Sequence, residues 1–149
     1  MSLNVITVEK EYTLAVPRAK LFKFLTNDLH QHPTPSSNAI HSVQHFGDHK
    51  KININVSGGE THSVLGKLEE IDEANFGYKY SVVEAKDFPD KVEKTTHDVK
   101  LLEGPNGGTI AKDTVSYFYK GDVPPTDFKA AQDKVHGILK HLEAHLLAN

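Results

Sequence analysis

Hydrophobic and polar residues alternate at every second position through most of the chain, and this period changes only near its two ends. Such alternation is typical of strands that bury one face. It predicts a first strand at residues 4–14 and further strands between 39 and 120, which include 50–56, 60–71, 76–84, 90–103 and 109–122. Because short turns, such as 57–59 and 104–108, join the later strands without helices between them, the sheet is predicted to be antiparallel.

Two segments have the 3.6-residue period of a helix. Residues 16–27 predict a short amphipathic helix with Pro17 at its first helical position, and the turn formers of 32–38 end any helix there. Residues 126–148 predict a long helix that Thr126 or Asp127 caps. The antiparallel sheet is the only large surface that can cover its apolar stripe, which consists of Phe128, Ala131, Val135, Ile138, Leu142 and Leu146, with Leu139 beside it.

Composition excludes several classes of protein. The chain has 149 residues, a length typical of one domain, so we expect a single domain over 1–149. Zero cysteines exclude disulfides, thiolate metal sites and a cysteine nucleophile. A net charge of −3 without a lysine or arginine stripe argues against nucleic acid as a partner. The sequence shows neither a secretory leader nor a run of about 18 apolar residues, so we expect a cytoplasmic protein without a membrane partner.

The stretch HSVQHFGDHKK at 41–51 brings together His41, His45, Asp48 and His49. It can be a metal site, a phosphate-binding loop or a crowded turn. Strand alternation followed by a turn separates the three histidines, whereas a metal site needs ligands that converge. A phosphate loop needs several glycines that free backbone N–H groups, and only one is present. We therefore predict a polar turn that binds neither metal nor phosphate.

Order and composition together resemble the plant class-ten pathogenesis-related proteins, the relatives of the major birch-pollen allergen. The resemblance implies an α+β helix-grip fold, in which a seven-stranded curved antiparallel sheet wraps around the long C-terminal helix. Two short helices follow the first strand, and the sheet and the long helix enclose a hydrophobic cavity. The stretches that carry the resemblance are LFKFL (21–25), IDEANFGYKYSVVE (71–84), VEKTTHDVKL (92–101), GPNGGTIAK (104–112), YKGD (119–122) and LEAHLLAN (142–149).

The resemblance also implies a function. It points to an intracellular carrier or sensor of small hydrophobic or amphipathic plant metabolites, such as cytokinins or flavonoids, that is linked to the defence response. No cofactor and no metal is expected, and the protein is expected to be a monomer or a weak dimer. The related abscisic-acid receptors share the fold but need longer gate loops than the short VSGGET turn at 56–61 provides.

Strand parity and the resemblance together predict which residues face the cavity. Tyr78 and Tyr80 can either line the cavity or be ordinary core residues, and Lys50 can turn inward or extend its ammonium to the rim. The predicted ligand-binding residues are Leu25, Lys50, Ile52, Ile54, Tyr78, Tyr80, Val82, His97, Val99, Asp113, Val115, Tyr117, Val135 and Ile138.

His97 and Asp113 are unusual members of this set, because an inward carboxylate is costly unless it is paired. If residue 102 pairs with 108 across the turn, His97 lies directly opposite Asp113. A register offset by two leaves only a diagonal contact. The pair is either a polar anchor for a ligand or the acid–base pair of an enzyme that acts on a plant metabolite.

Two other enzymatic functions of related proteins match this sequence only in part. The ribonuclease activity attributed to the family uses two glutamates and a tyrosine, which match Glu93, Glu143 and His145, so the tyrosine is replaced. Norcoclaurine synthase, a relative that catalyses a condensation, uses a cavity lysine that has no match here. Both readings are weaker than the carrier.

Overall fold

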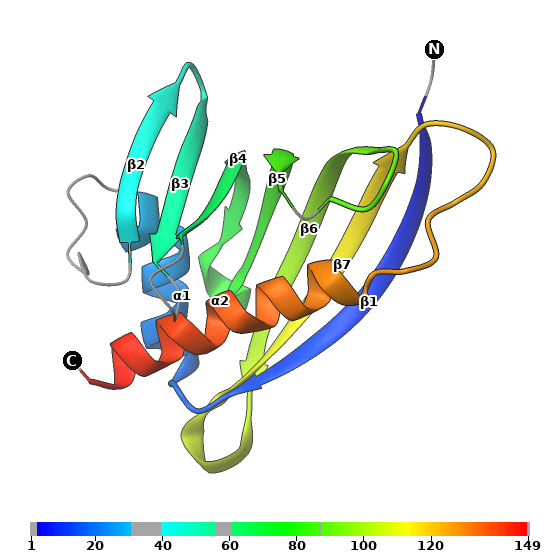
Figure 1. Ribbon diagram of the computed structural model, residues 1–149. Coiled ribbons are helices and arrows are strands. Elements are labelled where there is room, and N and C mark those ends of the chain that lie inside the picture. The colour runs from blue at the N-terminus through cyan, green and yellow to red at the C-terminus, as the bar shows by residue number, and fades with distance from the viewer. Residues whose placement is uncertain (1–2, 31–39, 56–60, 87, 149) are drawn as a thin grey trace.

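The computed structural model describes residues 3–30, 40–55, 61–86 and 88–148. They form a seven-stranded antiparallel sheet and two α-helices, α1 (Arg18–Thr26) and α2 (Lys129–Leu147) (Figure 1). Neighbouring strands follow the order β1-β7-β6-β5-β4-β3-β2, so the predicted antiparallel sheet is confirmed. The strands are β1 (Asn4–Leu14), β2 (Ile40–Phe46), β3 (His49–Asn55), β4 (Thr61–Asp72), β5 (Gly77–Ala85), β6 (Val92–Glu103) and β7 (Thr109–Tyr119).

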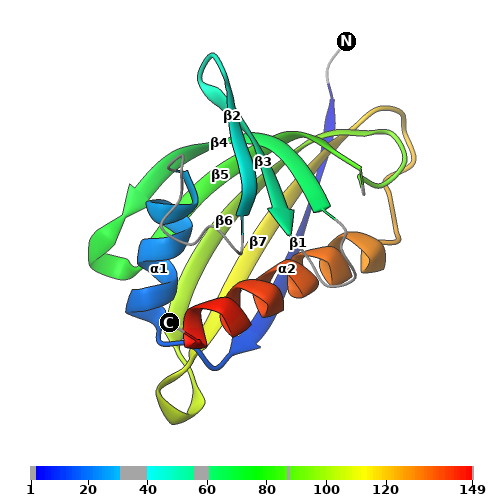
Figure 2. The same cartoon turned by 60° about the vertical axis from the view of Figure 1, so that its left-hand side comes forward.

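The sheet curves around α2, which crosses its concave face (Figure 2). Irregular registers between β4 and β5, at Leu65/Gly66 and Leu68/Glu70, are bulges of the kind that bend a strand. Gly66 is required at the first of these, because a Cβ there would collide with the carbonyl oxygen of Ser81. The bend creates the concave surface against which the helix packs.

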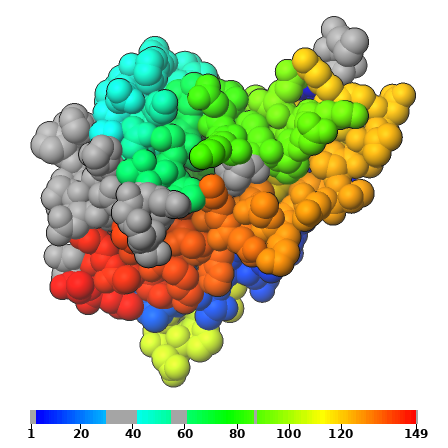
Figure 3. Space-filling view, in the orientation of Figure 1, coloured from blue at the N-terminus to red at the C-terminus, as the bar shows by residue number. Residues whose placement is uncertain are grey.

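Helix α2 buries the C-terminal part of the predicted stripe and leaves the rest of it half-buried. Leu139, Leu142 and Leu146 are buried, and Val135 and Ile138 pack against the same core. In the space-filling view, α2 lies between the N-terminal residues in blue and the sheet residues in green (Figure 3). Within the residues that the structure describes, no helix is long and apolar enough to cross a membrane.

The predicted start of the long helix was wrong by a few residues. The helix begins at Lys129, and its N-cap is Phe128, which provides no side-chain cap. Asp127 contributes differently, since its carboxylate accepts a hydrogen bond from the Lys129 backbone N–H at 3.1 Å. Pro124 and Pro125 precede this end and keep the chain out of helical geometry there.

The predicted short helix is confirmed as α1, with a shifted start. Pro17 is its N-cap in an extended conformation rather than its first helical residue. The Pro17 carbonyl still accepts the first helical hydrogen bond, from Leu21 N–H at 3.0 Å. The predicted second helix corresponds to the 3-10 turn η1 (Asp28–His30), and residues 31–39 lie outside the described residues.

The β2–β3 connection is the predicted tight turn. Phe46 pairs with His49, and only Gly47 and Asp48 lie between them. Gly47 has a φ of +64°, a conformation that glycine adopts readily. The predicted turn at 57–59 lies outside the described residues.

The predicted register of the β6–β7 hairpin was wrong by two residues. Leu102 pairs with Ile110, so His97 lies opposite Val115 and Asp113 lies opposite Val99. All five residues 104–108 are used by the turn, in which Asn106 and Gly107 have positive φ. The turn keeps the five-residue length of the predicted one but lies one residue further along the chain, so His97 and Asp113 become diagonal neighbours.

Candidate functional site

A pocket of about 200 Å³ lies between the concave face of the sheet and α2. Residues of β1 and of β3 to β7 form its floor, and α2 with Leu25 of α1 covers it. All the residues predicted to bind a ligand line this pocket: Leu25, Lys50, Ile52, Ile54, Tyr78, Tyr80, Val82, His97, Val99, Asp113, Val115, Tyr117, Val135 and Ile138. Their position is therefore as expected, while their binding role stays a prediction.

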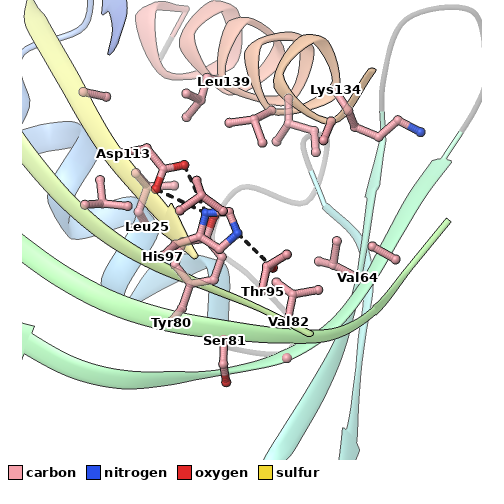
Figure 4. A pocket seen from close by; sticks show the side chains of 18 of the residues that line it. Leu25, Val64, Tyr80, Ser81, Val82, Thr95, His97, Asp113, Lys134 and Leu139 are labelled. Carbon is pink, nitrogen blue, oxygen red and sulfur yellow. Dashed lines mark hydrogen bonds and ion pairs between the residues drawn. The ribbon is translucent and has the colours of Figure 1, made fainter. Parts of the chain in front are cut away.

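His97 and Asp113 form a hydrogen-bonded pair in this apolar pocket (Figure 4). His97 Nδ1 lies 3.0 Å from Asp113 Oδ2 and 3.2 Å from Oδ1. Both side chains are almost completely buried, with exposed fractions of 9% and 5%. The contact spans the diagonal of the ladder, which a ring on one side and a carboxylate on the other can bridge.

Thr95 completes the contacts of the imidazole. Its Oγ1 lies 3.2 Å from His97 Nε2, so both ring nitrogens have partners. An ionised carboxylate can only accept, so Nδ1 carries a proton, and in the neutral ring Nε2 accepts the Thr95 hydroxyl proton. The nitrogen that a general base would use is thereby occupied by Thr95.

Aromatic rings extend from this pair along the pocket floor. The rings of Tyr80 and His97 stack with centroids 4.2 Å apart and an interplanar angle of 5°. Tyr78 stacks on Tyr80 at 5.9 Å. Burial, and after it the charge of Asp113, raises the pKa of Tyr78 and of Tyr80 above the ordinary tyrosine value. These phenols stay neutral until strongly alkaline pH.

Two further predicted residues lie toward the edges of the pocket. Tyr117 is buried, as expected, and its ring lies 4.7 Å from that of Phe128 at the start of α2. Lys50 lines the pocket and is half-buried, which fits an alkyl chain that covers apolar surface.

Several residues that line the pocket were not predicted, although strand parity could have identified some of them. Thr95 shares the inward parity of His97 and Val99, yet its short polar side chain gave no apolar signal. Tyr12 lines the pocket from β1, in parity with buried Leu14. Leu139 was placed beside the stripe but is buried against the pocket.

The three positions matched to a ribonuclease do not form one site. Glu93 pairs with Lys120 at 3.2 Å, beside the end of the sheet where β1 starts. Glu143 accepts a hydrogen bond from the Ala15 backbone N–H at 2.6 Å, just past the other end of β1. The length of that strand separates them by about 30 Å. His145 lies in α2, two residues from Glu143.

The histidines of the β2–β3 hairpin are spread over the turn. His49 Nδ1 lies 2.9 Å from Asp48 Oδ1, and Lys67 Nζ lies 3.2 Å from Asp48 Oδ2. His45 is exposed and pairs across the ladder with Lys50, while the side chain of His41 lies outside the described part of the chain. Among the described residues, no three potential ligands come together in a way that could hold a metal ion.

Comparisons with known proteins agree with this geometry. The family model described as "Pathogenesis-related protein Bet v 1 family" matches residues 4–149. The chain is 42% identical to "Pathogenesis-related protein 2" of Phaseolus vulgaris, over 99% of both chains. It is 41% identical to "Disease resistance response protein Pi49" of Pisum sativum, over 99% of this chain and 98% of that protein.

A solved structure shows the same fold at lower identity. The crystal structure of Ara h 8.0201 superposes with a TM-score of 0.70 at 35% identity, covering 98% of this chain and 100% of that one. The family match and the full-length relatives agree with the arrangement of sheet, helix and pocket. The chain therefore belongs to the pathogenesis-related Bet v 1 family of class 10 pathogenesis-related proteins.

Proposed function

We propose that this protein binds one small apolar or amphipathic molecule in the pocket under α2 and acts as its carrier or sensor in a defence response. The observation that supports this most is the composition of the lining, which is mostly apolar and holds the buried polar pair of His97 and Asp113. Ligand sites are commonly apolar concavities with a small number of polar groups that set orientation. The names of its relatives, which refer to pathogenesis and disease resistance, support the defence setting.

The pocket favours moderate affinity over strict selectivity. Burial of about 300 Å² of ligand surface contributes about 7 kcal/mol before the entropy costs of association. The whole of this contribution corresponds to a dissociation constant of about 10 μM, and immobilisation of the ligand weakens binding from that value. Cytokinins and flavonoids are of the right size class and character for such a pocket.

A neutral fluorescent apolar probe, N-phenyl-1-naphthylamine, whose diarylamine nitrogen stays unprotonated at pH 7, tests the proposal. It should bind with a saturable 1:1 isotherm, and Ile138→Trp, which fills the pocket from α2, should weaken binding at least tenfold. Ala144→Trp is the matched control, because Ala144 is exposed on the same helix. Equal binding by both variants would place the probe on another surface and contradict the proposal.

A second candidate, an enzyme with His97 and Asp113 as acid–base pair, is supported by the 3.0 Å contact between them. It requires Thr95 to leave Nε2 so that a substrate proton can reach that nitrogen. Turnover of a bound metabolite that is lost in His97→Gln would favour the enzyme. Binding of many ligands without any turnover favours the carrier.

A further inference from the structure

Asp113 is the acidic residue among those that line the pocket, and it is 3% exposed. Among the described residues, the hydrogen bonds to its carboxylate come from Nδ1 of His97. An ionised carboxylate has about four lone-pair sites and accepts only. The group left to meet a ligand is therefore an acceptor, and it selects ligands that donate.

The negative charge of Asp113 is a second constraint on the kind of ligand that the pocket can bind. When His97 is neutral, with Nε2 accepting from Thr95, the pair carries the full negative charge of Asp113 inside an apolar pocket. A neutral donor such as a hydroxyl leaves that charge uncompensated, whereas a cation neutralises it. A ligand carboxylate at the same place would meet like charge without water to screen it.

Aromatic side chains line the same pocket as the carboxylate. Tyr12, Tyr78, Tyr80 and Tyr117 all line the pocket. Burial first and the charge of Asp113 second raise the pKa of Tyr12, Tyr78 and Tyr80, so the carboxylate acts on all three rings. Aromatic faces around a negative charge are the surroundings that favour an organic ammonium.

Lysines near the pocket can oppose the binding of a cationic ligand at Asp113. Lys10 lies directly opposite Asp113 on β1, but it is exposed, and none of the ion pairs between described residues joins it to Asp113. Lys134 extends away from the His97–Asp113 pair (Figure 4). Lys67 pairs with Asp48 and Glu69. Lys50 also lines the pocket, from β3, but Lys10 is the lysine that pairs directly opposite Asp113 in the sheet, so its replacement tests competition with a ligand.

We propose that the pocket is selective for flat organic amines, whose protonated nitrogen pairs with Asp113 while the ring system packs against the Tyr78–Tyr80–His97 stack. This inference rests on the proposed function and names the ligand class of the same pocket. It places the amine at the carboxylate rather than at the imidazole, because Thr95 already occupies Nε2.

Three indole compounds that differ only in their end group test the proposal by calorimetry at pH 7: tryptamine, tryptophol and indole-3-acetate. The wild-type protein should bind the amine at least tenfold more tightly than the alcohol, and the acid most weakly. In Asp113→Asn the amine should bind no more than about threefold better than the alcohol, since one charged pair is worth roughly tenfold or more. The Asn carbonyl can still accept from His97 Nδ1, which keeps the pair in place.

Two variants serve as controls. Asp98→Asn removes a carboxylate from the outer face of β6, beside His97, and should leave the ranking unchanged. Lys10→Met removes the competing cation from an exposed position and should tighten amine binding by a few fold. If Asp113→Asn does not fold, amine binding that Lys10→Met leaves unchanged or weakens would contradict the proposal instead.

The outcomes separate the two proposals. Binding of the acid as tightly as the amine, or of the alcohol as tightly as the amine, overturns the amine selectivity and leaves the carrier function standing. Tighter amine binding that Asp113→Asn does not reduce also overturns it. Failure of the three indoles and of the naphthalene probe alike overturns both proposals.

Discussion

Replacement of Leu142 by Ala tests whether α2 holds the two halves of the site together. Leu142 is 0% exposed, belongs to the main core and also lines the pocket. Deletion of a fully buried leucine side chain costs about 2–5 kcal/mol of the free energy of unfolding. Because the new void joins an existing pocket, neighbouring side chains cannot collapse to fill it from all sides. We therefore expect a loss in the upper half of that range.

The same exchange at Leu147 is the matched control. Leu147 lies on the same helix but is 54% exposed, so Leu147→Ala should cost less than about 0.5 kcal/mol. Lys140→Ala should be similarly mild, because its ion pair with Glu143 lies near the surface.

Urea unfolding, followed by circular dichroism, measures both effects. With a dependence of about 2 kcal/mol per molar urea, the Leu142 variant should unfold at a midpoint about 1.8–2.5 M lower than the wild type. The Leu147 variant should unfold within about 0.3 M of it. Equal losses at the two positions would show that α2 does not present the Leu142 face to the sheet, and the account of the pocket would fail with it.

Three further predictions concern single groups. Stoichiometric zinc should leave the melting temperature unchanged, because specific binding to the native state must raise it; a saturable rise that disappears when His45 and His49 are both replaced by Ala would contradict this. Replacement of His97 by Phe should weaken the binding of ligands with a neutral polar head and leave the binding of purely apolar probes unchanged. If both ligand types bind as tightly as before, the His97–Asp113 pair does not anchor the ligand. The pKa of Tyr78 and of Tyr80 is raised in the folded state, so the stability they contribute is complete below the ordinary tyrosine pKa and is lost as pH rises beyond it. Absorbance at 295 nm during an alkaline titration should show these phenols ionising only on unfolding, and early reversible ionisation of all tyrosines would contradict their burial.

The inward face of each strand was predictable from the sequence because side chains alternate strictly along a strand. Val99, Val115 and Tyr117 mark the apolar parity of β6 and β7, and His97 and Asp113 share it. The same rule would have found Thr95 if polar residues of that parity had been counted.

The register of β6 against β7 could not be predicted in the same way. It depends on which five residues stay unpaired, 103–107 or 104–108, and the observed turn also contacts a distant segment. A Cβ at Gly108 would collide with the carbonyl oxygen of Leu14, at the end of β1. The bulges of β4 likewise depend on the approach of Ser81 to Gly66. Such contacts join residues far apart in the chain, and no local pattern reports them.

The volume of the pocket could not be predicted from the sequence either. It depends on the distance between α2 and the sheet, and contacts between side chains of several elements determine that distance together. One of these contacts is made by Glu143, whose carboxylate accepts a hydrogen bond from the Ala15 backbone N–H and so holds α2 beside the end of β1. The family resemblance had instead matched Glu143 to a residue of the ribonuclease activity.

Methyl chemical shifts during titration with the naphthalene probe test the central claim, that the ligand lies between the sheet and α2, most directly. Val82, Val99 and Val115 are buried and line the pocket, whereas Val83 and Leu102 are exposed neighbours in the same sheet. We expect the three inner valines to shift together and saturate at one equivalent, while the two outer residues keep their shifts. Shifts at Val83 and Leu102 with unchanged inner valines would contradict the account.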